Sequence, residues 1–400
     1  MFVEELKKIF RIKSLLIVLA FGLVYYLLFI SAQMRSYPGS YEMTVEAGKE
    51  LMEKYGDSLS PEEYREYEKD YEQLKSAPGG ILETMNTFIA GNALMAEYGI
   101  SDVTQLEETI AEAAGSSGSS ELGTLLMMEI YDTFSAEDYS NAMEEQIALD
   151  IRKNYLKLYE QEVFKDSGSE NGTGYYDSLN EAQRRRVYER NTSEIYGIMP
   201  WDVRDCTFKV FQFCAFFMIA AVLFFIVPYI VKDNRSGVLP LQYTGKAGRQ
   251  YDFYRLFAIL AAAVIILAAL SAVFLFLCKL NGIFPFWNSP VSAFASYFIC
   301  WLPLSLGELV LLGLAVVIGL ALGLVLIACL ATRFCANYIT AIAWMLPMIL
   351  VGAVFCGTLI VNLLDLNQLP WLALGISAGI FAVGLAGNLI GWLWNRRRDF

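Results

Sequence analysis

Six long apolar stretches dominate this sequence of 400 residues and limit the folds that are open to it. An α-helix needs roughly 20 apolar residues to cross a bilayer, and each stretch approaches or exceeds that length. Because no water is available inside the bilayer, backbone groups there must bond to one another, which a helix allows. We therefore predict an all-α membrane protein with six transmembrane helices, at residues 14–32, 208–231, 256–277, 309–330, 338–363 and 370–394.

The N-terminal end joins a basic segment to the first apolar stretch. Residues 1–13 hold four Lys and Arg side chains, with Leu6, Ile9 and Phe10 on the other side of a predicted helix. This pattern is typical of an amphipathic helix that lies on the cytosolic membrane surface. A cleaved signal peptide would also begin with basic residues. Stretch 14–32 is longer than the apolar part of such a peptide and no small-residue cleavage site follows, so we interpret it as an uncleaved span.

Residues 33–206 form a polar insert between the first two spans. We expect a large, all-helical extracytoplasmic domain there, because no strand alternation of weight is visible and apolar residues recur at helical spacing. The insert has 35 acidic and 15 basic residues, hence a charge of −20, whereas the rest of the chain carries +8. Its acidic surface is either simply solvated or attractive to a cationic ligand such as a basic peptide.

Several helices of the insert can be placed from the sequence. Ser60, Pro61 and Glu63 are typical of a helix start. Helical spacing continues through 81–98 and predicts a long amphipathic helix over 136–165. A final helix over 177–190 carries three consecutive arginines. We expect these to form a solvated face or a patch near anionic headgroups: Arg184, Arg185 and Arg186.

Charge orients the remaining residues, 207–400, which form a bundle of five helices. With six spans, the short cytosolic segments hold 13 Lys and Arg residues, and the two short outer loops hold only Lys279. Because basic residues keep short loops in the cytoplasm, both termini are predicted to be cytosolic. A seventh span would place either Arg333 or the basic C-terminus outside. We therefore interpret 291–306 as an outer re-entrant or interfacial helix.

The sequence excludes several kinds of chemistry. It contains no His, which removes Ser-His-Asp triads and most zinc sites, and we predict no catalytic or metal-binding residue. No Gly-x-x-x-x-Gly-Lys-Ser/Thr loop is present, so the chain does not hydrolyse ATP by that route. The acidic insert argues against nucleic-acid binding. Glu308 and Asp365 fall at predicted outer ends of spans, unlike the midplane acids of ion-coupled transporters. The seven Cys are interpreted as small buried side chains.

Small residues recur on two of the predicted spans at the spacing that lets helices approach closely. We expect packing faces there, either within the chain or across a dimer. The fourth span contributes Gly319 and Gly323, and the sixth contributes Gly387 and Gly391.

Residues 232–255, between the second and third spans, are the largest predicted cytosolic loop. The loop begins with an acidic residue, an Arg, a Gly and a Leu at every second position. A Thr, an Arg and a basic residue at the start of the next span follow them. These are Asp233, Arg235, Gly237, Leu239, Thr244, Arg249 and Arg255. The pattern resembles the first cytoplasmic loop of ABC-2 type transporter permeases. The order of a surface helix, one span, a large insert and five further spans is also similar to that family.

The resemblance implies a function as the permease subunit of an ATP-binding cassette transporter. In that family the loop forms a coupling helix, here about 239–253, that docks on a separate ATPase subunit. The implied contacts to the ATPase are Arg235, Gly237, Leu239, Thr244, Arg249 and Arg255. ATP and Mg²⁺ would bind to that partner and no cofactor to this chain. A second permease, identical or different, would complete the transporter among the membrane lipids.

The resemblance further implies export of a substrate such as a peptide, a lipid or a drug. The absence of Cys from residues 33–205 favours a bacterial plasma membrane. Two alternatives stay open from the residues themselves. The basic loop residues can act only as topology signals. The chain can also be a receptor or mechanotransmission protein that uses its helical insert and moves no substrate.

Overall fold

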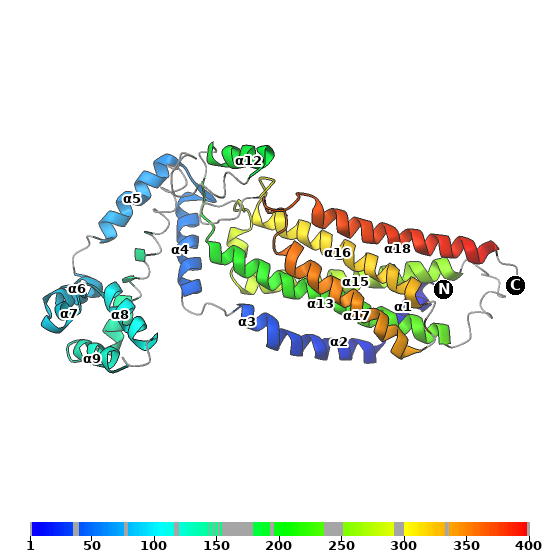
Figure 1. Ribbon diagram of the computed structural model, residues 1–400, viewed down its shortest axis with the longest axis horizontal. Helices are drawn as coiled ribbons and strands as arrows, with labels where there is room; N and C mark the ends of the chain where they lie inside the picture. Colours follow the sequence, from blue (N-terminus) through cyan, green and yellow to red (C-terminus); the bar gives the residue numbers. More distant parts are fainter. Residues whose placement is uncertain are drawn as a thin grey trace. The chain divides into compact units, whose positions relative to one another are not determined.

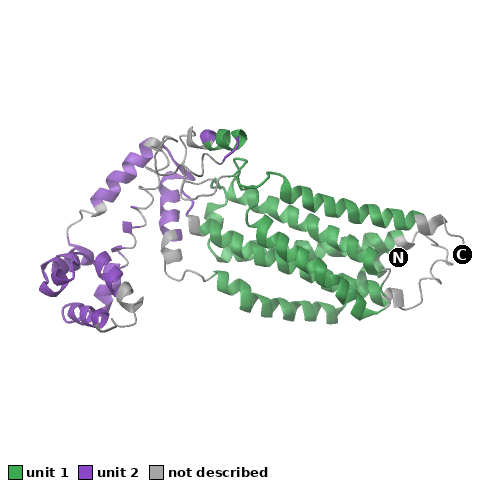
Figure 2. Cartoon of the chain, viewed as in Figure 1, with its two compact units in different colours: residues 1–36, 181–187, 201–400 green, residues 37–180, 188–200 purple. Residues whose placement is uncertain are grey.

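The structure is a computed structural model and describes residues 2–34, 40–75, 79–115, 120–143, 179–192, 196–235, 251–291, 300–332 and 337–397, with six single residues besides: 145, 146, 149, 150, 153 and 335. The chain divides into two compact units, shown in different colours in Figure 2. The membrane unit comprises Met1–Ser36, Glu181–Val187 and Trp201–Phe400. The insert unit comprises Tyr37–Asn180 and Tyr188–Pro200.

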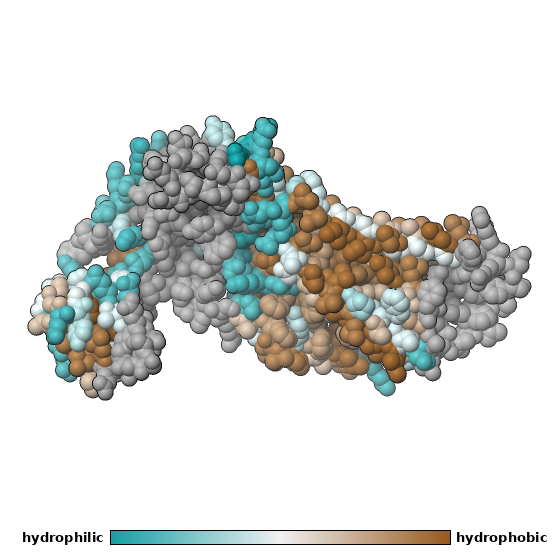
Figure 3. Space-filling model, viewed as in Figure 1, coloured by the Kyte–Doolittle hydropathy of each residue, from teal (hydrophilic) through white to brown (hydrophobic). Residues whose placement is uncertain are grey.

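Among the described residues of the membrane unit, six helices are long and apolar enough to cross a bilayer, which confirms the prediction of an all-α, multi-pass membrane protein (Figure 1). Apolar side chains cover much of their visible surface (Figure 3). The first span joins α2 (Ile12–Tyr25), the π-helical turn η1 (Tyr26–Ile30) and α3 (Ser31–Met34). The others are α13 (Trp201–Arg235), α15 (Tyr251–Leu280), α16 (Leu306–Ala331), α17 (Tyr338–Phe355) with η5 (Cys356–Ile360), and α18 (Leu372–Arg397).

Helix α13 forms the centre of the membrane unit. It packs against α2, α15, α16 and α17, and 72% of its most apolar window is buried, against 11% for the first span. The first span contacts α13 through stacked rings, including Tyr25 on Phe217 at 5.3 Å and Phe29 on Phe213 at 6.2 Å between centroids. The hydroxyl of Tyr25 also donates to the carbonyl of Phe213 at 3.2 Å. Most of the surface of the first span is therefore not covered by the rest of the chain.

The segment before α16 differs from the helix predicted over 291–306. Residues 300–305 are not helical, and Cys300 forms an antiparallel bridge with Asp365, as Pro290 does with Ser305. Residues 292–299 lie outside the described part of the chain. Helix α16 begins at Leu306 because Ser305 and Glu308 form a capping box, with 2.9 and 3.2 Å between side chain and backbone. Glu308 thus caps a helix at the end of its span.

The described part of the insert unit is mostly helical. Its helices are α4 (Ser40–Tyr55), α5 (Pro61–Lys75), α6 (Ile81–Gly91), α7 (Ala93–Glu97), α8 (Val103–Gly115) and α9 (Ser120–Tyr131), and it shares α12 (Glu181–Thr192) with the membrane unit. Its core contains Met85, Ile89, Met95, Leu106 and Leu126, which are fully buried. The described residues from 136 to 153 are helical, and the rest of the predicted helix 136–165 lies outside the described residues.

One detail of the insert contradicts the sequence prediction and another confirms it. Strands β1 (Ser58–Leu59) and β2 (Tyr196–Gly197) pair antiparallel, so the expectation of a wholly helical domain is wrong at this point. Two residues are too short to show alternation, and the pairing depends on contact between distant segments. The predicted cap of α5 is confirmed, because the Glu63 amide donates to the Ser60 hydroxyl at 3.3 Å and Glu63 accepts from the Ser60 amide at 2.8 Å.

The predicted helix 81–98 is interrupted at Asn92, which starts α7. Its side-chain oxygen accepts from the amides of Leu94 and Met95 at 2.9 and 3.3 Å, and its amide nitrogen donates to Glu129 at 2.9 Å. We expect Asn92→Ala to lower the free energy of unfolding of the insert unit by about 1 kcal/mol, since a helix cap is lost. Thermal unfolding followed by circular dichroism would measure it. An unchanged midpoint would show that the cap is dispensable.

Candidate functional site

The predicted coupling loop begins and ends on described helices. Arg235 is the last residue of α13, and α15 begins at Tyr251. Four of the predicted ATPase contacts and most of the predicted coupling helix lie outside the described residues: Gly237, Leu239, Thr244 and Arg249. Arg255 lies in the second turn of α15, where its Nη2 donates to the carbonyl of Ile230 on α13 at 3.2 Å. This contact joins the two helices at the base of the loop.

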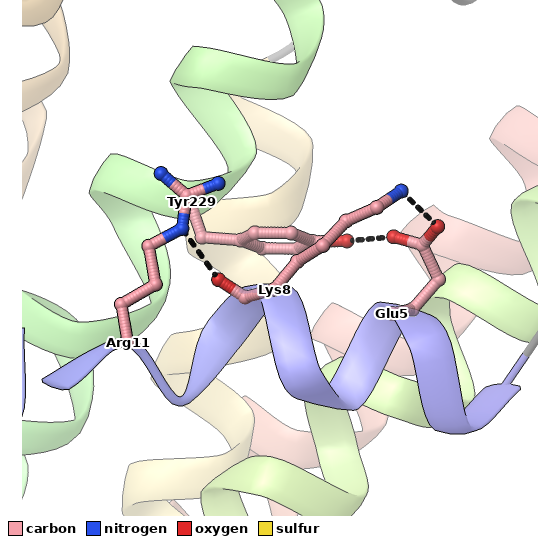
Figure 4. Close-up of polar contacts among 4 residues, drawn as sticks. All are labelled: Glu5, Lys8, Arg11 and Tyr229. Carbon is pink, nitrogen blue, oxygen red and sulfur yellow. Dashed lines mark hydrogen bonds and ion pairs between the residues drawn. The ribbon is translucent and has the colours of Figure 1, made fainter.

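The predicted surface helix is present as α1 (Phe2–Ile9) and packs against α13 and α15 at the same base. Its residue Glu5 is 4% exposed, which the sequence analysis did not foresee. The Glu5 carboxylate accepts a hydrogen bond from the hydroxyl of Tyr229 on α13 and pairs with the Lys8 ammonium, both at 2.5 Å (Figure 4). Hydrogen bonds to an ionised carboxylate are among the stronger ones in proteins.

A signal for the role of Glu5 was present in the sequence. Glu5 precedes Ile9 by four residues, so both lie on one face of a helix, and Ile9 is 2% exposed. An acid on the apolar face of an amphipathic helix needs a partner, because an unpaired buried carboxylate is costly. The ring of Phe10 adds an apolar contact to Phe225 of α13 at 6.2 Å between centroids. What the sequence could not identify is the partner, Tyr229.

These contacts join three helices at the ends that border residues 232–255. The Glu5–Tyr229 bond links α1 to α13, and the Arg255–Ile230 bond links α15 to α13. Tyr229 and Ile230 lie within two turns of the end of α13. The three helices are therefore tied to one another at the ends that border the loop.

The predicted glycine faces lie at the contact between α16 and α18 of the same chain. A methyl group on Gly319 would lie 2.8 Å from the Ser377 hydroxyl oxygen, and one on Gly323 would lie 2.8 Å from the Phe381 amide nitrogen. One on Gly387 would lie 2.5 Å from a terminal carbon of Leu330, and Gly391 is half-buried further along α18. The backbones of α16 and α18 thus approach closely where these glycines lie.

Two polar side chains strengthen the same helix pair. Ser377 of α18 donates to the carbonyl of Val316 at 2.8 Å, and Asn388 donates to the carbonyls of Leu326 and Gly384 at 2.8 Å. Both side chains are buried, so these bonds give partners to polar groups that could not form hydrogen bonds with lipid. Together the glycines and the two polar residues make α16 and α18 a tightly joined pair.

A second polar cluster joins α12 to two loops of the membrane unit, one before α16 and one before α18. Gln183 of α12 donates to the carbonyl of Leu366 at 2.6 Å, and Arg186 donates to the carbonyl of Cys300 at 3.0 Å. The Trp301 indole donates to the carbonyl of Gln368 at 2.8 Å. Arg184 and Arg185 are exposed, whereas Arg186 is half-buried and bound to the carbonyl of Cys300, a contact that the sequence did not predict. The partner of Arg186 belongs to a distant loop, which sequence spacing does not reveal.

The fold defines a multi-pass, all-α membrane protein with a separate helical unit inserted after the first span. All seven Cys thiols are free and buried, as the sequence predicted. No protein-family model, curated protein or solved structure matches the chain. The resemblance to ABC-2 type permeases thus depends on the loop motif and on the order of the spans.

Proposed function

We propose that this chain is the permease subunit of an ATP-binding cassette transporter of the ABC-2 type. A separate ATPase subunit would bind residues 232–255 and drive substrate movement. The observation that best supports the proposal is that α1, α13 and α15 are joined at the base of this loop. The Glu5–Tyr229 and Arg255–Ile230 hydrogen bonds join them. A loop that receives force from a partner needs helices that move with it.

The helix α13 is suited to conduct such a movement across the bilayer. Its 35 residues span roughly 50 Å at about 1.5 Å per residue, and it packs on four of the other spans. A displacement at Arg235 would therefore reach α2, α15, α16 and α17. The tightly joined pair of α16 and α18 would move as one body against α13. Export of a peptide, a lipid or a drug is the expected activity, with a second permease, identical or different, beside this one.

Charge supports one orientation for this assembly. The segments bordering α1, the 232–255 loop, Arg333 and the C-terminus hold 13 Lys and Arg residues, and the opposite short loops hold Lys279. Basic short loops stay in the cytoplasm. We therefore place both termini and the loop in the cytosol and the insert unit outside, in a bacterial plasma membrane.

The test is co-purification of an ATPase. We expect the solubilised wild-type chain to bring down a P-loop ATPase from its native membrane, and Arg235→Glu/Arg249→Glu to lose it, because two basic contacts on the loop are reversed in charge. Mass spectrometry of the eluate identifies the partner. Absence of any ATPase from the wild-type eluate, even after mild crosslinking, would contradict the permease assignment.

A matched control separates docking from topology. Arg396→Glu/Arg397→Glu reverses the same charge on the same predicted side of the membrane, away from the loop. This variant should retain the ATPase at the wild-type level. Equal loss from both variants would mean that the arginines act only as topology signals. Labelling of single cysteines from outside would show whether either variant has changed its orientation.

A receptor or mechanotransmission function is the second candidate, and helix α12 favours it. Residues 181–187 of this helix belong to the membrane unit, where Gln183 and Arg186 hold the outer loops, while residues 188–192 belong to the insert unit. Bonds between α12 and the loops of the membrane unit suit the transmission of a signal through this helix. ATP-dependent substrate flux in reconstituted vesicles would support the permease function, and ligand binding without flux would support this one.

A further inference from the structure

The insert unit contains a half-open cavity between α4 and α5, and this cavity is independent of the proposed transport function. Its volume is about 140 Å³. An apolar cavity of about 150 Å³ is enough for a molecule the size of benzene. Leu51 and three tyrosines are among the residues that line it: Tyr55, Tyr67 and Tyr71. The cavity therefore has the size and the aromatic lining of a site for one small group.

The tyrosine rings are held in place by their surroundings. Tyr67 is 4% exposed and Tyr71 is 9% exposed. The ring of Tyr55 lies edge-on to that of Tyr67, with 6.4 Å between centroids. Burial raises the pKa of Tyr71 and of Tyr55 above the ordinary phenol value, so both remain neutral at physiological pH. The faces of neutral aromatic rings attract cations, and fixed rings do so at little entropic cost.

The charges around the cavity favour a positively charged occupant. Glu50 and Asp70 line it, and Glu66 lies close enough to pair with Lys54 at 3.3 Å. The insert carries a charge of −20 over residues 33–206, so the surrounding field also attracts cations.

The chain itself shows what kind of cation fits. Lys54 lines the cavity, its ammonium lies 4.9 Å from the centroid of the Tyr55 ring, and it pairs with Asp70. An alkylammonium group is thus already held by an aromatic face and a carboxylate. The Lys54 side chain is 46% exposed, and ion pairs at such positions contribute little stability. A cation from outside can therefore displace it.

We propose that this cavity binds an alkylammonium group supplied from outside the chain, in competition with Lys54. The group comes either from a small organic amine or from the lysine side chain of a peptide. Asp70 and the tyrosine faces bind the charge, and Lys54 occupies the site when the ligand is absent.

Binding is tested on the full-length chain in nanodiscs of deuterated lipid by saturation-transfer difference NMR. The probes are tetramethylammonium chloride, N-acetyl-lysine methylamide and, as a neutral molecule of similar shape to the first, tert-butanol. We expect signal from at least one ammonium probe and none from tert-butanol. Signal from tetramethylammonium assigns a small amine as ligand, and signal from the lysine derivative alone assigns a peptide side chain. Absence of signal from both would overturn the proposal.

Two substitutions have opposite expected effects on binding, so a general loss of folding cannot explain both results. Asp70→Asn should weaken binding about threefold, because a carboxylate partner is lost, and Lys54→Gln should strengthen it about threefold, because the internal competitor is removed. Glu97→Gln removes the same charge from an exposed position that does not line the cavity, and should leave binding unchanged. Equal affinity in the Asp70→Asn and Glu97→Gln variants, or weaker binding in Lys54→Gln, would overturn the proposal.

Discussion

Gly323→Ala is expected to lower the free energy of unfolding by about 2 kcal/mol, because the added methyl group meets backbone and not side chain. Its carbon would lie 2.8 Å from the amide nitrogen and 2.9 Å from the Cα of Phe381, and 3.0 Å from the carbonyl carbon of Ile380. Backbone atoms of a helix cannot rotate away. Helix α18 would therefore have to move from α16, which weakens the bonds of Ser377 and Asn388 as well.

Two glycines on the facing helix, α18, provide graded controls for this result. A methyl group on Gly387 meets only the end of the Leu330 side chain, which can change rotamer, so Gly387→Ala should cost less. Nothing lies within 4 Å of the same carbon on Gly379, so Gly379→Ala should be neutral. Equilibrium unfolding in mixed micelles would rank the three variants. Equal destabilisation by Gly323→Ala and Gly379→Ala would contradict the close approach of α16 and α18.

Glu5→Ala is expected to release α1 from α13, with a local cost of about 2 kcal/mol, which is typical when a buried hydrogen bond to a charged group is removed. The substitution leaves the Tyr229 hydroxyl without its acceptor and Lys8 without its carboxylate. We expect faster hydrogen exchange of residues 2–10, with the spans unchanged. Tyr229→Phe should have a similar effect from the other side of the bond, and the double variant should cost little more than either one.

Glu4 is a matched control for Glu5 because it occupies the neighbouring position and forms the same kind of pair. Its carboxylate contacts Lys7 at 3.0 Å, but the two side chains are 67% and 69% exposed. Exposed pairs of this kind contribute little, so Glu4→Ala should leave the hydrogen exchange of α1 as it is. If Glu4→Ala releases α1 as strongly as Glu5→Ala does, general charge at the N-terminus, and not the Tyr229 bond, holds this helix.

The two predictions also bear on the proposed function. If α1 moves with α13 and α15, its release by Glu5→Ala should reduce activity without removing the ATPase from the complex, because residues 232–255 are untouched. Arg235→Glu/Arg249→Glu should instead remove the ATPase from the complex and leave α1 attached to α13. The two sets of variants therefore separate docking of the partner from transmission of its movement.

The sequence by itself determined the class of the protein, the six apolar helices and the helix at the N-terminus. These features depend on local quantities, namely the length of an apolar stretch and the spacing of apolar residues, and a bilayer makes them decisive. It also identified Gly319, Gly323 and Gly387 as close-packing positions. The cap at Ser60 was equally visible, because its partner Glu63 lies only three residues away.

Only the tertiary structure decided which distant segments meet. Glu5 and Tyr229 are 224 residues apart, Arg186 and Cys300 are 114 apart, and β1 pairs with a strand at the far end of the insert. The glycine faces were compatible with a contact inside the chain or across a dimer, and the choice of α18 as the partner of α16 depends on the fit of whole helix surfaces. Hydropathy determines which segments enter the membrane, whereas the shapes and hydrogen bonds of side chains determine their neighbours.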